Sequence, residues 1–132
     1  MTPPPEDWRA SLLELRAALL RLHKTLLDAE RLSYEIEHGP IKNNGDYLQL
    51  LIHNERFTWL QPYTKLVVNI DETEESKEPV SAEAVEALWE RAKQLTAEPA
   101  VHEPLGKLLA NSAEVKVALE GVAEVVKLRA GT

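Results

Sequence analysis

Apolar residues recur in alternating steps of three and four from Trp8 onward, which is the period of one face of an α-helix. The positions on this line are Leu12, Leu15, Leu19, Leu22, Leu26 and Ala29. A second line, about 100° round the same helix, comprises Leu13, Leu20, Leu27 and Tyr34. The combined apolar sector is too wide for a two-stranded seam. The pattern therefore predicts a long first helix that packs against two neighbours in a bundle.

This first helix is expected to end at Gly39 and Pro40, because glycine suits the left-handed position after a helix and proline cannot continue one. A turn over residues 43–46 follows, and either Asn44 or Asp46 is expected to cap a second helix that runs from about Asp46 to Leu60. That segment is apolar on nearly all sides, which is typical of a buried helix. We therefore expect it to be the central element of the fold.

Three further signals place the later helices. Pro62 suits the first turn of a third helix, and Ser81 and Ser112 are typical caps for two more. A run of acidic residues over 71–75 lies between Pro62 and Ser81. Negative charge is unfavourable at a helix C-terminus, so the third helix is expected to end there and an acidic linker is expected over 73–80. The sequence predicts an all-α fold, a single-domain helical bundle of five or six helices over residues 1–132, with a flexible proline-rich lead-in over 1–6.

Composition narrows the class of protein. The chain has 132 residues, the size of one domain, and its 44% hydrophobic and 28% charged residues argue against disorder. It contains no cysteine, which excludes disulfides and thiolate chemistry. Its net charge of −7 makes nucleic acid and anionic membranes poor partners. Because the sequence shows no signal peptide and no apolar run long enough to cross a bilayer, we expect a cytoplasmic protein.

Polar residues on the apolar faces of the helices are the candidates for chemistry. On the first helix, His23, Glu30, Tyr34 and Glu35 lie near one another, with His23, Glu30 and Tyr34 on one face. A histidine and a carboxylate two turns apart can ligate a metal or act as acid and base. The alternative is that these side chains only cover the edge of the bundle.

Three candidates lie outside the first helix. His53 lies in the apolar second helix, where an ionisable group is costly to bury without a partner, and Arg56 or a residue of the first helix is the expected partner. Trp59 lies in the same helix and is either a core anchor or part of a ligand site. Asp71 begins the acidic run, which is either a solvated linker or a weak site for a divalent cation. For each of these residues a structural role and a functional pocket both stay open.

Two stretches resemble a known family. The pattern runs from His23 through Glu30-Arg31 to Tyr34-Glu35 and continues in Phe57-x-Trp59-Leu60-x-Pro62 and Ile70-Asp71-Glu72. It resembles a family of small, uncharacterised bacterial all-helical proteins over about residues 15–75. The resemblance implies that His23, Glu30, Tyr34, Glu35, Trp59 and Asp71 belong to one signature, and it carries no activity with it.

Two functions remain in view. The chain has no glycine-rich phosphate loop, no Gly-x-Ser-x-Gly sequence and no His-x-x-x-His spacing, which favours a protein that is not an enzyme. The wide apolar sector of the first helix favours a helical interaction or regulatory module that self-associates as a homodimer or binds a protein partner. The alternative is small-molecule or metal binding in a pocket between the first three helices, with the identity of any metal or cofactor left open.

Overall fold

The computed structural model describes residues 2–97 and 103–130, and in this part of the chain α-helices joined by turns and loops form the structure, with no strand. The helices are α1 (Trp8–His38), α2 (Asn44–His53), α3 (Glu55–Thr58), α4 (Gln61–Glu74), α5 (Ala82–Thr96), α6 (Glu103–Asn111) and α7 (Ala113–Ala130). The all-α class is confirmed. The described residues form seven helices rather than five or six, because the expected second helix is divided.

The division falls at Asn54. Its backbone is extended, with φ −88° and ψ 127°, and its side chain accepts a hydrogen bond from the backbone N–H of Arg56 at 2.9 Å. Asparagine is a preferred N-cap because its side chain satisfies a free donor of the first turn. Asn54 therefore ends α2 and starts α3, which turns the chain toward α4.

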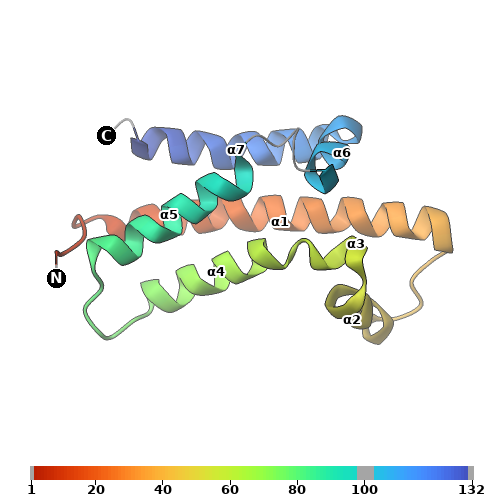
Figure 1. Cartoon of the computed structure of the whole chain (residues 1–132), viewed down its shortest axis with the longest axis horizontal. Coiled ribbons are helices and arrows are strands. Elements are labelled where there is room, and N and C mark those ends of the chain that lie inside the picture. The colour runs from red at the N-terminus through yellow and green to blue at the C-terminus, as the bar shows by residue number, and fades with distance from the viewer. Residues whose placement is uncertain (1, 98–102, 131–132) are drawn as a thin grey trace.

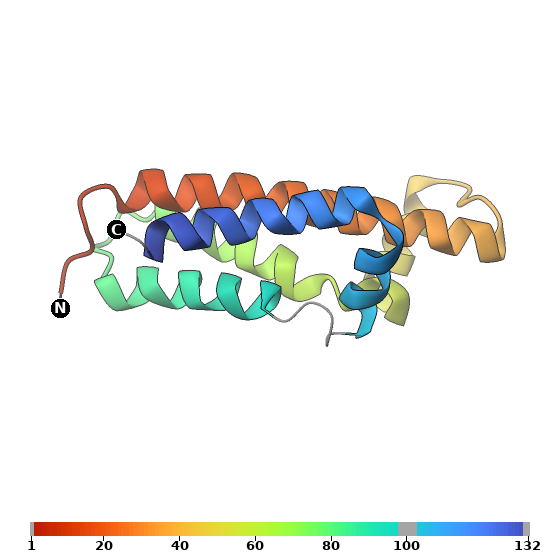
Figure 2. The same ribbon diagram turned by 90° about the horizontal axis from the view of Figure 1, so that it is seen from above.

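Four of the helices form an antiparallel bundle. α1 and α5 run in one direction and α4 and α7 in the other, and α1 contacts α4 and α7, which in turn contact α5 (Figure 1, Figure 2). α1 has 31 residues, whereas α4 has 14 and α5 has 15. At 1.5 Å per residue α1 is about 46 Å long, roughly twice the length of α4 or α5. The far end of α1 is covered instead by α3 and α6, with α2 outside them (Figure 1).

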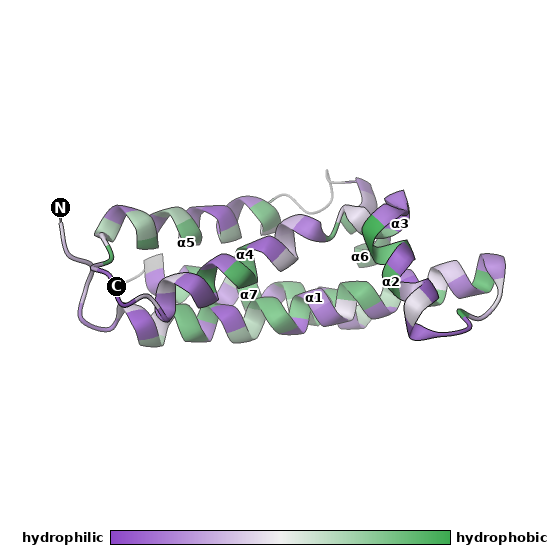
Figure 3. Cartoon of the chain, turned by 90° about the horizontal axis from the view of Figure 1, so that it is seen from below, coloured by the Kyte–Doolittle hydropathy of each residue, from purple (hydrophilic) through white to green (hydrophobic). Residues whose placement is uncertain are grey.

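The core follows the first leucine line. Trp8, Ala18 and the five leucines from Leu12 to Leu26 on this line are buried against α4, α5 and α7. Figure 3 shows hydrophobic positions recurring along α1, interleaved with hydrophilic ones. Tyr63 of α4 is also buried, and its hydroxyl donates to the backbone carbonyl of Leu95 at 3.0 Å. The heptad pattern thus predicts the buried face of α1.

The expectation that the second helix is central was wrong. No residue of α2 is buried, and Leu48 and Ile52 are among the exposed large hydrophobic residues. α2 projects from the side of the molecule, where it packs mainly on α3 (Figure 1). An apolar composition makes burial favourable, but burial also needs other segments to cover the helix, and α2 lies beyond the ends of α4 and α5.

The helix ends follow the expected chemistry, with one correction. Gly39 has φ 85°, a left-handed conformation that suits glycine, and the side chains of Ser81 and Ser112 accept hydrogen bonds from the helices that follow them. The cap of α2 is neither Asn44 nor Asp46 but Asn43, whose side chain accepts from the backbone N–H of Asp46 at 2.8 Å. Among the described helices, none has the length and apolar character that crossing a bilayer requires.

Candidate functional site

Five polar side chains line one edge of α1 at intervals of seven residues, and we call them the α1 polar seam. Each contacts a residue of α3 or α4, or of the turn between them. The pairs are Arg9 with Glu74, Arg16 with Asp71, His23 with Thr64, Glu30 with Trp59, and Glu37 with Arg56. Because the two sides run antiparallel, the partner numbers fall as the α1 numbers rise. The seam joins the whole length of α1 to the α3–α4 segment.

The contacts of the seam differ in kind. Arg16 forms an ion pair with Asp71, and the carboxylate of Glu37 accepts from Nη2 of Arg56 at 2.6 Å. His23 and Glu30 lie between these ion pairs and contact uncharged side chains: Nε2 of His23 lies 2.8 Å from Oγ1 of Thr64, and the carboxylate of Glu30 accepts from Trp59. Cations occupy the N-terminal end of the α1 side and anions its C-terminal end. This reversal of charge favours the antiparallel alignment over a parallel or shifted one.

The seam separates residues that the sequence placed in one candidate group. Asp71 pairs with Arg16, whereas Trp59 donates from Nε1 to Oε2 of Glu30 at 3.1 Å. Arg16 and Glu30 are fourteen residues apart on α1, which is about 21 Å along the helix axis. Asp71 and Glu30 therefore cannot hold the same small ligand. The structure brings Glu30 and Trp59 together and places Asp71 elsewhere.

Tyr34 and Glu35 stabilise the end of α1. The ring of Tyr34 lies 4.6 Å from that of His38 and 5.8 Å from that of Phe57, measured between centroids. The carboxylate of Glu35 accepts from the backbone N–H of Ile41 at 2.8 Å, which holds the turn after the helix. These contacts give both residues a structural role.

His53, the remaining candidate, is the last residue of α2 and is exposed. Metal coordination needs several donors on one ion. In residues 2–97 and 103–130, no group of three or more histidines, aspartates and glutamates could hold a metal ion.

Burial shifts the proton equilibria of two seam residues in opposite senses. Glu30 is half-buried, and burial raises the pKa of its carboxyl above 4.5, although the Trp59 hydrogen bond and the charges of Arg56 and Lys107 oppose this shift. Burial lowers the pKa of the His23 imidazole below 6.5. In both cases the low-dielectric surroundings disfavour the charged form.

Two cavities lie beside the seam, and Trp59 lines both. The first, which we call the α2–α4 cavity, has a volume of about 1030 Å³ and lies between α1, α2, α3 and the start of α4. Its wall is mostly apolar and includes Leu27, Leu51, Ile52 and Phe57. A cavity of this size and lining is typical of small-molecule sites.

The second cavity, which we call the α6–α7 cavity, has a volume of about 930 Å³ and lies between α1, α3, α6 and the start of α7. Charged side chains of both signs line it. They are Asp28, Glu30, Glu55, Arg56, Glu103, Lys107 and Glu114. Acidic side chains outnumber basic ones in this cavity, whereas the wall of the α2–α4 cavity is mostly apolar.

Three contributors to these contacts were not predicted from the sequence: Arg9, Arg16 and Thr64. The signal for the seam was present, since polar residues stand at every seventh position from Arg9 to Glu37. Comparison of the chain with family models, with curated proteins and with solved structures gives no match. Function is therefore inferred from the side chains and surfaces of the molecule itself.

Proposed function

We propose that the chain is a non-catalytic interaction module that self-associates as a homodimer through α1. The observation that supports this is an exposed line of alanine and leucine on the side of α1 that faces away from α7. It consists of Ala10, Leu13, Ala17 and Leu20, and we call it the α1 apolar stripe. Leu13 is 45% and Leu20 is 38% exposed. Steps of three, four and three place all four residues on one face.

The shape of the stripe suits a second copy of itself. Small and large residues alternate along it, so Leu20 of one α1 can fit beside Ala17 of another in an antiparallel pair. Alanine allows the two helix backbones to approach closely, because the distance between helices depends on the side chains at the contact. Val68 of α4, also exposed, shares a face with Thr64 and Asp71 and widens the apolar surface beside α1.

Charge complementarity also favours a second copy. Glu14 and Arg21 are exposed and flank the stripe on the side away from α4. In an antiparallel pair in which Ala17 packs beside Leu20 of the second copy, Glu14 lies opposite Arg21 of the second copy. Twofold symmetry makes this contact twice. The α1 apolar stripe and its flanking charges are therefore complementary to the same surface of a second copy.

Light scattering at micromolar concentration tests the dimer. The variant with both Leu13→Lys and Leu20→Lys is expected to be monomeric and to keep its helical circular dichroism. Val117→Lys is the matched control, because Val117 is an exposed apolar residue of α7 away from the stripe, and it is expected to stay dimeric. A monomeric wild-type protein would overturn the proposal.

A charge exchange tests the pairing itself. Glu14→Arg places like charges opposite each other and is expected to weaken the dimer, and adding Arg21→Glu is expected to restore it. If the second change weakens association further, the antiparallel arrangement is wrong.

A second function, small-molecule binding, is supported by the α2–α4 cavity, whose wall is formed by the first helices of the fold, including His23 and Trp59. An apolar probe such as 1-decanol is expected to bind there and to raise the melting temperature, since a ligand that binds only the folded state stabilises it. Native mass spectrometry would detect the bound mass. The change of Ile52→Glu in the wall is expected to abolish binding.

A further inference from the structure

The charged side chains that line the α2–α4 cavity are all cationic. They are Lys65 of α4 and Arg91 of α5, and no aspartate or glutamate of the described residues lines this cavity. This is unexpected in a chain with a net charge of −7. In the α6–α7 cavity, by contrast, acidic residues are in excess. The cationic lining of the α2–α4 cavity favours a ligand with a negative charge.

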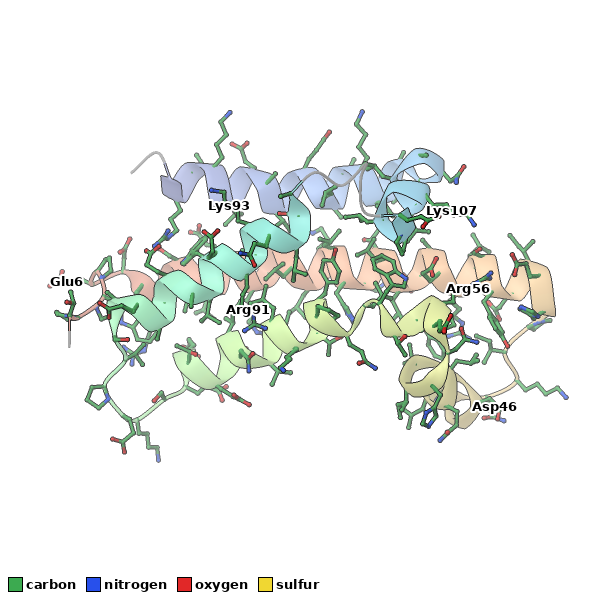
Figure 4. The ribbon with its side chains drawn as sticks, in the orientation of Figure 1. Glu6, Asp46, Arg56, Arg91, Lys93 and Lys107 are labelled. Atoms are coloured by element: carbon green, nitrogen blue, oxygen red, sulfur yellow. The ribbon has the colours of Figure 1, made fainter. Side chains whose placement is uncertain are left out.

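Neither cation is neutralised by another of the described residues. Nη1 of Arg91 donates to Oδ1 of Asn69 at 2.8 Å, a neutral acceptor that orients the guanidinium without cancelling its charge. In the part of the chain that the structure describes, neither Lys65 nor Arg91 forms an ion pair. Figure 4 shows Arg91 directed toward α4, whereas Lys93, two residues later, lies on the side of α5 toward α7. Arg91 thus lies on the α4 side of α5, where it lines the cavity.

The rest of the wall is suited to an apolar group. Leu27, Leu51, Ile52 and Phe57 lie on the α1, α2 and α3 sides, and the two cations lie on the α4 and α5 sides. The N-terminal end of α4, at Gln61, also lines the cavity and carries the positive end of the helix dipole. The cavity therefore has an apolar part and a positively charged part.

We infer that the α2–α4 cavity binds an amphipathic carboxylate, with its apolar chain against α2 and α3 and its carboxylate beside Lys65 and Arg91. The inference rests on the proposed small-molecule function and specifies the class of ligand. Arginine and lysine both bind carboxylates by charge-assisted hydrogen bonds. An apolar wall supplies most of the contact area, and a few polar groups fix the orientation of the ligand.

Three probes with the same ten-carbon chain isolate the contribution of the charged group: decanoate, 1-decanol and decylammonium. Isothermal titration at low ionic strength, below the concentration at which each probe forms micelles, measures their affinities. Decanoate is expected to bind about tenfold more tightly than decanol, and decylammonium more weakly than decanol. Equal binding of decanoate and decanol would overturn the carboxylate inference while leaving small-molecule binding in place. Binding of none of the probes would overturn both.

Charge-removing variants locate the site. Arg91→Gln is expected to weaken decanoate binding about tenfold, and the exposed Lys65→Gln about threefold, with decanol unaffected in both. Lys93→Gln is the matched control on α5, because it removes the same charge outside the cavity, and its decanoate affinity is expected to equal that of the wild type. If all three variants bind decanoate like the wild type, the carboxylate does not lie in this cavity. Because Arg91 also bonds to Asn69, circular dichroism must show that its variant is folded, and Lys65→Gln tests the site independently of that bond.

Discussion

The two ends of α1 both carry apolar residues but have different surroundings. Over residues 8–26 its leucines are buried against α4, α5 and α7, whereas residues 27–38 include no buried residue. The second segment also has apolar residues, among them Leu27, Leu32 and Ile36, but it lies beyond the ends of α4 and α5 and contacts the short helices α2, α3 and α6 (Figure 1). Leu32 and Ile36 are exposed although they are apolar, so the length of the neighbouring helices limits how much of α1 becomes core.

Polar and aromatic contacts replace the missing core at the C-terminal end. Trp59 donates to Glu30, Arg56 pairs with Glu37, and the guanidinium carbon of Arg31 lies 4.5 Å from the centroid of the Tyr47 ring. Among the described residues, the one buried side-chain polar atom without a hydrogen-bond partner, Nη1 of Arg56, is also here. An unsatisfied buried donor costs free energy. We therefore expect this end of the molecule to open more readily than the bundle end.

The largest expected effect is a core truncation at the bundle end. Leu19 is fully buried, so Leu19→Ala is expected to lower the free energy of unfolding by about 2–5 kcal/mol, because it removes apolar contacts and leaves a cavity. Leu48→Ala in α2 removes an exposed side chain and is expected to cost less than about 0.5 kcal/mol. Urea denaturation of both variants measures the difference. Equal losses would show that α2 is as well packed in solution as the bundle.

The next effect tests the polar contact at the other end. Glu30→Ala leaves the indole N–H of Trp59 without its acceptor and is expected to cost about 1–3 kcal/mol. Trp59→Phe removes the donor, and the double variant is expected to show a coupling of at least about 0.5 kcal/mol, since the two groups are in contact. Urea denaturation of the two single variants and the double variant gives this coupling. Additive effects would mean that the hydrogen bond does not stabilise this end.

The fold was predictable where it depends on local sequence. The leucine spacing gives the buried face of α1, Gly39 gives its end, and Ser81 and Ser112 give the starts of α5 and α7. Each of these depends on residues within a few positions of one another. The exposure of α2 was not predictable in this way, because it depends on which distant segments cover it. The division at Asn54 was missed because an asparagine inside an apolar run is compatible with a continuous helix.

The candidate site was predictable only in part. The sequence placed His23, Glu30 and Tyr34 on one face of α1, and the structure places His23 and Glu30 in the α1 polar seam, but the partner of each depends on how α4 crosses α1 in space. Asp71 and Trp59 both face α1, yet they meet it at points two heptads apart. The cationic lining of the α2–α4 cavity combines residues of α4 and α5, and their meeting follows from the bundle and not from any local pattern.

A smaller, pH-dependent effect separates two seam residues by sign. Burial lowers the pKa of His23, so the unfolded chain takes up a proton on this residue more readily than the folded chain, and stability is lost as the pH falls below about 6.5. Burial raises the pKa of Glu30, so its charge costs stability at neutral pH, and this cost disappears as the pH falls toward 4.5.

Urea denaturation at about pH 7 and about pH 4.5 measures both contributions. His23→Gln is expected to reduce the loss of stability between the two pH values, and Glu30→Gln is expected to increase that loss, because the variant lacks the gain that protonation of Glu30 supplies. If the two variants changed the pH dependence in the same direction, one of the two residues would not be buried as the structure shows.

The smallest expected effect concerns an ion pair that belongs to neither end. Nζ of Lys24 lies 3.0 Å from the carboxylate of Asp28 one turn later, but the side chains are 80% and 62% exposed. Exposed pairs of this kind contribute about 0.3–0.5 kcal/mol, and the order with the base first is the less favourable one on a helix. Lys24→Gln is therefore expected to change the free energy of unfolding by less than about 0.5 kcal/mol, with a further decrease in high salt. A loss above about 1 kcal/mol would mean that exposed charges stabilise α1 along its whole length. The cost of Glu30→Ala would then reflect its charge rather than its contact with Trp59, and the contrast between a packed end and a polar end would fail.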